Sequence, residues 1–165
     1  MKMKIIFCLL ALNLIHGTVF SQKKLEDGIY RIDQSEKKEG LHAQSNKAVI
    51  QFNNLFVDEN PEEYDPIVIL TDDYVPLELA AVPVIKKDDL QRKMLSFQLT
   101  HNATKKLTDF TTNIPGSLVV IVVNGEAISI HKIYDPVTVG SIQLSRCKGS
   151  GFDQIYTVLK RKLKA

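Results

Sequence analysis

The chain has 165 residues and a mass of 18.6 kDa, with 44% hydrophobic and 24% charged residues. These proportions are ordinary for a globular protein and exclude a disordered, collagen-like or coiled-coil protein for the bulk of the chain. The formal net charge is +2, but both excess lysines lie in the first 21 residues. The neutral remainder is a poor candidate for binding nucleic-acid phosphates.

Residues 1–21 have the layout of a secretory signal peptide. Two lysines form a basic start, residues 5–15 are apolar apart from one asparagine, and cleavage is expected between Ser21 and Gln22. Eleven residues span about 16 Å as a helix, which is too short to cross a bilayer. We therefore expect one mature domain, 22–165, without a transmembrane segment, in the periplasm or secreted; an uncleaved anchor is the alternative.

The first half of the mature chain contains weak strand patterns at 28–32, 48–52 and 67–70. Residues 77–82 lie between two prolines, which disfavours a long helix and allows an edge strand. Charge is uneven, since residues 58–89 carry a net −8 and residues 90–165 a net +7. We expect these sections to attract each other within the fold; contact of the basic section with an acidic partner is the alternative.

The second half has clearer elements. Alternation at 95–99 predicts a half-buried strand. A helix follows, capped by Thr100 or Asn102 and stopped by Pro115-Gly116. Its apolar stripe consists of Ala103, Leu107, Phe110 and Ile114.

The run LVVIVV at 118–123 predicts a central strand that is buried on both faces. Asn124-Gly125 predicts a two-residue hairpin turn, because both central positions of a type I′ turn need a positive φ. Residues 127–133 would be the partner strand, and residues 137–144 alternate again with an interruption at Gly140.

A final helix is expected after Ser150 and Asp153, which have the spacing of a capping box. Its apolar stripe would contain Phe152, Ile155, Tyr156, Leu159 and Leu163, and its last turns are basic. The order β-α-β-β-β-α predicts an α+β fold, with a mostly antiparallel sheet and helices packed on one face.

Residues 75–165 resemble the periplasmic head subdomain of SecD-type protein-export factors. The matching positions are Ala103, Val123-Asn124-Gly125, Ser129, Pro136, Gly140 and Ile142. Ile130-His131 stands where the family has Ala-Pro, Gly140 lacks the second glycine that usually adjoins it, and the closing helix is basic. The family also has proton-conducting transmembrane helices, which are not expected in this chain. What the resemblance implies is the role of the head: a soluble fold that contacts extended polypeptide outside the inner membrane.

An exposed edge strand would supply such contacts, because its unpaired backbone groups can bind an extended chain. The candidate binding edge contains Val137, Val139, Gly140, Ile142 and Leu144. We expect a non-enzymatic module that binds unfolded polypeptide or an envelope protein complex. An inhibitor-like protein with one specific envelope partner is the first alternative.

Reactive side chains are few. Cys147 is the single cysteine after the signal peptide, and its neighbours Arg146 and Lys148 would lower a thiol pKa if it were exposed. His42, His101 and His131 lack the spacing of a zinc site. The acidic stretch 58–63 fails the EF-hand pattern, although an irregular calcium site stays open, and Lys148-Gly149-Ser150-Gly151 lacks the nucleotide-loop pattern. We expect no cofactor, and a small hydrolase using Cys147 or a histidine is the second alternative.

Overall fold

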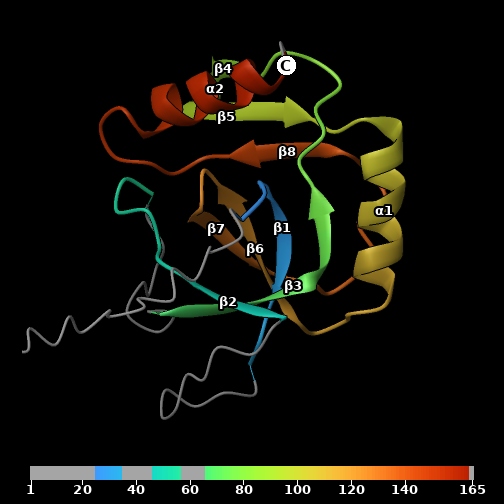
Figure 1. Cartoon of the computed structure of the whole chain (residues 1–165). Coiled ribbons are helices and arrows are strands. Elements are labelled where there is room, and N and C mark those ends of the chain that lie inside the picture. The colour runs from blue at the N-terminus through green and yellow to red at the C-terminus, as the bar shows by residue number, and fades with distance from the viewer. Residues whose placement is uncertain (1–24, 35–45, 57–65, 164–165) are drawn as a thin grey trace, which may run out of the picture.

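The computed structural model describes residues 25–34, 46–56 and 66–163, so the predicted signal peptide, His42 and the acidic stretch lie outside the described residues. The fold is α+β, as predicted, and the second half follows the predicted order (Figure 1). The strands of the whole described chain form two antiparallel sheets, of five and three strands. The elements are β1 (Gly28–Ile32), β2 (Lys47–Ile50), β3 (Ile67–Pro76), β4 (Val84–Lys87), β5 (Lys93–Gln98), α1 (His101–Thr112), β6 (Leu118–Val123), β7 (Glu126–Lys132), β8 (Ser141–Leu144) and α2 (Gly151–Lys162).

The five-stranded sheet has the order β2-β3-β1-β6-β7, so the LVVIVV strand, β6, lies inside the sheet as predicted. Strands β6 and β7 form the predicted hairpin, and Asn124 and Gly125 have φ values of 54° and 83°. An asparagine tolerates the left-handed region better than most residues, and a glycine adopts it without strain. The turn therefore has the residue types that its backbone requires.

The two ends of this sheet are joined by the chain that follows β2. The Asn53 N–H donates to the Ala127 carbonyl at 2.8 Å, and the Ala127 N–H donates to the Gln51 carbonyl at 2.9 Å. The segment that follows β2 thus pairs with β7, the strand at the other end, and the sheet encloses a small apolar interior. This interior contains Tyr30, Ile32, Ile50, Ile67, Ile69, Val120, Val122 and Ala127.

Strand β6 is buried on both faces because this closure supplies the second cover. Val120 and Val122 lie in the enclosed interior, whereas Val119, Ile121 and Val123 belong to the larger core that both helices share. The prediction of a doubly buried central strand is confirmed. Its physical cause is a curved sheet on one side and a helix-backed core on the other.

The three-stranded sheet has the order β4-β5-β8, and α2 lies against β4 and β5 (Figure 1). Strand β4 had no sequence prediction. Residues 77–82 form only an isolated bridge between Leu79 and Leu99, and the strand begins after Pro83. Pro83 cannot donate a ladder hydrogen bond, so regular pairing starts beyond it.

Helix α1 begins after Thr100, whose Oγ1 accepts from the Ala103 N–H at 3.2 Å. The predicted cap at Thr100 is therefore confirmed over Asn102. The predicted stripe of Ala103, Leu107, Phe110 and Ile114 is buried in the larger core.

Helix α2 buries Phe152, Ile155 and Leu159, whereas Leu163 is 38% exposed just beyond the helix end. The capping-box prediction is wrong. Ser150 has φ −94° and ψ 12°, and its side chain makes no capping hydrogen bond, because an N-cap residue needs extended backbone to turn its hydroxyl toward the first turn.

The expected attraction between the acidic and basic sections is local among the described residues. Asp88 pairs with Arg92 four positions later, at 2.7 Å. Lys162, from the last turn of α2, pairs at 2.9 Å with Asp27, which lies outside the acidic section. The longest-range ion pair that the described residues make therefore joins α2 to the start of β1.

Candidate functional site

The predicted binding edge divides into two parts in the structure. Strand β8 begins at Ser141, so the expectation of a strand from Val137 is wrong. The Val137 N–H donates to Thr111 Oγ1, and the Val137 carbonyl accepts from Thr108 Oγ1, both at 2.9 Å. Two threonines of α1 therefore occupy the backbone groups of Val137, which cannot pair with another strand.

We call residues 137–140 the strap, and Gly140 is its last residue. An added side-chain carbon at Gly140 would overlap Thr104 Oγ1 of α1, so only a glycine permits this close approach. The Gly140 carbonyl accepts from the Leu99 N–H at 2.9 Å. The interruption seen in the sequence thus marks the point where the chain passes from α1 onto the three-stranded sheet.

Strand β8 itself pairs with β5, the only strand that pairs with it among the described residues. In an antiparallel ladder, hydrogen-bonded and non-hydrogen-bonded residue pairs alternate. The Leu99 N–H donates to the Gly140 carbonyl, so the next residue of β8, Ser141, and then Gln143 belong to non-hydrogen-bonded pairs. Their backbone N–H and C=O groups therefore point away from β5. Of the predicted side chains here, Leu144 is buried and Ile142 is half-buried against the core. The open edge therefore belongs to Ser141 and Gln143, which the prediction passed over.

Along β8 the prediction selected Ile142 and Leu144, the apolar positions of a period-two pattern, and these face the core. The alternate, polar positions of the same pattern would have identified the exposed members. Val139, in the strap, is 64% exposed and is the most accessible of the predicted side chains. The binding role of the edge stays a prediction, now centred on β8.

The two outer strands of the small sheet differ in charge. Strand β8 has the sequence SIQL, without charge or proline, whereas β4 has the sequence VIKK. Lysine and proline on an edge strand discourage pairing with other strands. By this criterion β8 is the unprotected edge of the small sheet, and β4 is a charged one.

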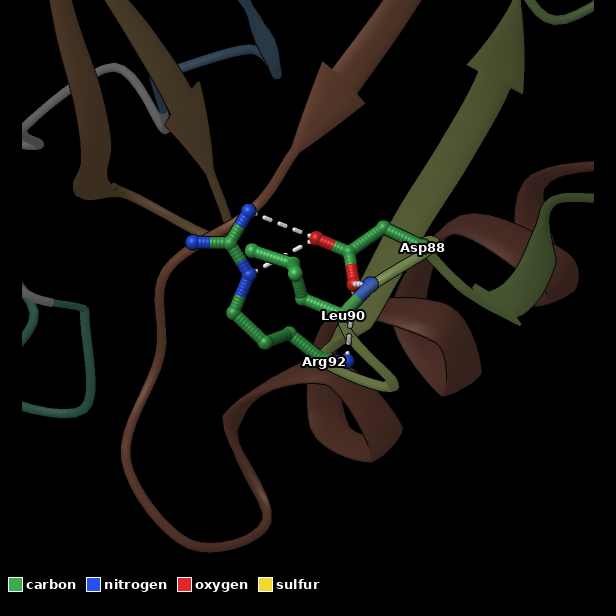
Figure 2. Close-up of polar contacts among 3 residues, drawn as sticks. All are labelled: Asp88, Leu90 and Arg92. Carbon is green, nitrogen blue, oxygen red and sulfur yellow. Dashed lines mark hydrogen bonds and ion pairs between the residues drawn. The ribbon is translucent and has the colours of Figure 1, made fainter.

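The turn between β4 and β5 is braced by Asp88, as Figure 2 shows. One carboxylate oxygen accepts from the Leu90 and Arg92 backbone N–H groups at 2.9 and 2.8 Å. The other oxygen accepts from the Arg92 guanidinium at 2.7 Å. The Arg92 N–H and guanidinium hold the pKa of Asp88 below its ordinary value. This network fixes a turn on which Leu90 is 71% exposed.

Cys147 does not have the environment of an activated nucleophile. It is partly buried, and burial raises the pKa of its thiol, an effect that the Phe152 N–H and Lys93 oppose. The expectation that Arg146 and Lys148 would lower this pKa applied to an exposed thiol, and this thiol is partly buried. A thiol with a raised pKa is largely protonated near neutral pH and is a weak nucleophile.

The described histidines are His101 and His131. His101 is exposed at the start of α1, and His131 on β7 lies 2.7 Å from Ser129 Oγ through its Nε2. Across the described ranges, no group of three or more metal-ligating side chains converges. In the same residues, no helix is long and apolar enough to cross a membrane.

A surface hollow of about 600 Å³ lies between the start of β1, the end of β3 and the last turns of α2. Its central polar group is Asp27, whose side chain is 7% exposed. One oxygen accepts from the Asn124 N–H at 2.6 Å, and the other pairs with Lys162. Both oxygens of this carboxylate make structural contacts, one to the Asn124 turn and one to α2, which indicates a structural role.

Comparison with known proteins gives similarity at the level of structure. No protein-family model and no curated protein matches the chain. The chain is similar to a solved structure of SecDF, described as a membrane component that enhances protein export, with 18% identity and a TM-score of 0.48 over 82% of this chain and 63% of that chain. A structure of SecDF in a super-membrane-facing form has 20% identity and a TM-score of 0.46, over 82% of this chain and 18% of that one. This chain therefore spans less than two thirds of the first and less than a fifth of the second.

Proposed function

We propose that this chain is an exported, non-enzymatic module that binds extended polypeptide, accessory to protein export or envelope assembly. The observation that carries the proposal is the uncharged edge of β8, which no described strand covers, with the backbone groups of Ser141 and Gln143 directed away from β5. The resemblance of residues 75–165 to the SecD head subdomain gives the same direction. Export follows from the predicted signal peptide at 1–21.

The expected mode of binding is strand addition, in which backbone groups supply affinity without reading sequence. Two residues offer two N–H and two C=O groups, and each net hydrogen bond contributes about 0.5–1.5 kcal/mol. The total of about 2–6 kcal/mol is reduced by the ordering of the bound chain. We therefore expect weak, sequence-tolerant and rapidly reversible binding, with dissociation constants near or above about 100 µM.

An enzymatic alternative has less support. The raised pKa of Cys147, with no histidine among the groups that shift it, disfavours a thiol hydrolase. An interaction protein with one specific envelope partner is the second candidate. The observation that favours it is the exposed Leu90 on a turn that the Asp88–Arg92 network holds in one conformation, so the side chain is presented without an ordering cost.

The test uses a variant that changes one open backbone group. Gln143→Pro removes an N–H that makes no bond to β5, so the ladder between β5 and β8 is retained. Binding of a reduced and alkylated, permanently unfolded polypeptide is measured by fluorescence anisotropy. We expect Gln143→Pro to abolish binding, and Gln143→Thr, which keeps the N–H, to bind as the parent does.

Two outcomes would overturn the proposal. One is equal binding by Gln143→Pro and Gln143→Thr, with both variants folded by circular dichroism. The other is no binding by the parent chain at several millimolar. Recovery of a single stoichiometric partner from envelope extract, retained by Gln143→Pro and lost in Leu90→Ser, would favour the second candidate.

A further inference from the structure

Two lysines of the small sheet oppose each other directly. Lys87 on β4 and Lys93 on β5 are register partners, and both are exposed. The Asp88 N–H donates to the Arg92 carbonyl at 2.9 Å, so the next pair along the ladder, Lys87 with Lys93, is a non-hydrogen-bonded pair. Side chains of such pairs are the closest across a ladder, and like charges placed there are destabilising.

No described acidic group nearby forms an ion pair with either lysine. Asp88 is occupied by Arg92, and Asp89 is exposed in the turn. Asp153 on the first turn of α2 lies near Cys147, as Lys93 does, but makes no ion pair with Lys93. Among the described residues neither lysine forms an ion pair, and the polar contact of Lys87 is a 3.4 Å hydrogen bond to Gln91. The two lysines therefore have no ion-pair partner among the described residues, and an anion placed beside them would be favoured.

Protection against self-association explains only part of this pattern. Lysines on an edge strand discourage pairing between copies, which accounts for Lys86 and Lys87 on β4. Strand β5 is the middle strand of its sheet, so Lys93 has no such use. A ligand that supplies carboxylates would account for all three lysines.

The backbone of β4 fits a strand-like ligand. Its ladder phase directs the N–H and C=O groups of Ile85 and Lys87 away from β5. No strand pairs with this side of β4 within the described part of the chain. Val84, at the start of the strand, is 56% exposed, so the edge presents apolar residues first and lysines last.

We infer that β4 docks an acidic extended peptide whose antiparallel strand has the order Glu-Glu-Ile-Val. The two glutamates would lie opposite Lys87 and Lys86. The glutamate opposite Lys87 would share a face of the sheet with Lys87 and Lys93 and relieve their repulsion, and the other would pair with Lys86 on the opposite face. The isoleucine and valine would lie opposite Ile85 and Val84. This inference is independent of binding at β8, because it concerns the opposite edge of the sheet and a ligand of defined charge.

The test compares three fluorescent peptides on the full chain by anisotropy, at low and high salt. The first contains Glu-Glu-Ile-Val between threonines, the second has lysines in place of the glutamates, and the third is the first with alternate backbone nitrogens methylated. We expect binding of the first peptide only, weakened at high salt because exposed charges are screened.

The variants locate the site. Lys87→Glu/Lys93→Glu should weaken binding of the acidic peptide at least about tenfold, the size expected for removing close charge pairs. Lys87→Gln/Lys93→Gln, which adds no new charge, should give a smaller loss in the same direction. Lys105→Glu/Lys106→Glu on α1 makes the same change in net charge at exposed positions and should bind as the parent does.

Several results would overturn the inference. Equal binding by the β4–β5 and α1 charge variants would mean that net charge alone attracts the peptide. Equal binding of the methylated peptide would exclude strand pairing. Binding of phosphatidylglycerol vesicles through the same lysines without peptide binding would identify a lipid-facing surface. Loss of unfolded-polypeptide binding in Gln143→Pro concerns β8 alone and leaves this inference standing.

Discussion

The two sheets of this protein differ in what happens at their edges. In the five-stranded sheet, residues 51–53 connect β2 to β7, and the end strands meet around an apolar interior. In the three-stranded sheet, β4 and β8 each have one side without a paired strand in the described residues. Closure satisfies backbone groups and protects a sheet, whereas an open edge is available for pairing.

The difference assigns separate roles to the two regions. The closed sheet contributes burial on both faces of β6 and is suited to stability. The open sheet is covered on one face by the core, and the polar positions of β8 and β4 lie at its edges. Substitutions in the closed sheet should therefore affect folding, and substitutions at the open edges should affect binding.

The largest effect is expected for an aspartate placed in β6. Val120 and Ile121 face opposite sides and are both buried, so Val120→Asp and Ile121→Asp each bury an unpaired carboxylate. We expect a loss of at least about 4 kcal/mol in the free energy of unfolding, measured by urea titration. Gln143→Asp on β8 is the matched control and should change it by less than about 0.5 kcal/mol. Tolerance of either β6 variant would show that one of its faces is not enclosed.

Local patterns predicted much of this fold because their causes are local. The stripe of α1 follows from helical periodicity, and the turn at Asn124-Gly125 follows from the need for a positive φ. The run LVVIVV predicts burial on both faces, but it does not say what covers them. Closure of the large sheet depends on contacts between Gln51, Asn53 and Ala127, more than seventy residues apart, which leave no pattern in either segment.

The candidate site was predicted less well than the fold. Alternation along 137–144 correctly placed an edge strand in this region but extended it over the strap. The strap is not a strand because Thr108 and Thr111 of α1 bond to the backbone of Val137, and these bonds depend on where α1 packs. Strand β4 was missed because VIKK is short and half charged. Its register with β5 is what makes Lys87 and Lys93 neighbours, and register is a tertiary property.

The ion pair that joins the two regions should give the next largest effect. Asp27→Ala removes the partner of Lys162 and the acceptor of the Asn124 N–H. We expect a loss of about 2–3 kcal/mol in the free energy of unfolding, less than for a fully buried pair because Lys162 is partly exposed. Asp27→Asn, which can still accept from Asn124, should lose less than half as much. Equal losses for both variants would mean that the ion pair contributes nothing.

The strap that limits the open edge can be tested at Gly140. In Gly140→Ala the added carbon would overlap Thr104 Oγ1, so α1 and the strap must separate, at a cost of about 1–3 kcal/mol in the free energy of unfolding. Ser141→Ala, one residue later and exposed, is the control and should change it by less than about 0.5 kcal/mol. A double-mutant cycle with Thr104→Ala should recover part of the loss. Additive losses would place the strain elsewhere.

The smallest effect separates stability from binding at the open sheet. Lys93→Glu replaces a repulsive pair with an attractive one opposite Lys87, and opposite charges across a ladder contribute about 0.2–1 kcal/mol. The free energy of unfolding should rise by that amount, while binding of the acidic peptide falls. Lys106→Glu makes the same change in charge on α1, where no lysine lies across a ladder. It should change neither the free energy of unfolding nor the binding of the acidic peptide. If Lys93→Glu lowered stability, the lysine pair would already be neutralised within the protein, and no acidic ligand would be needed to explain it.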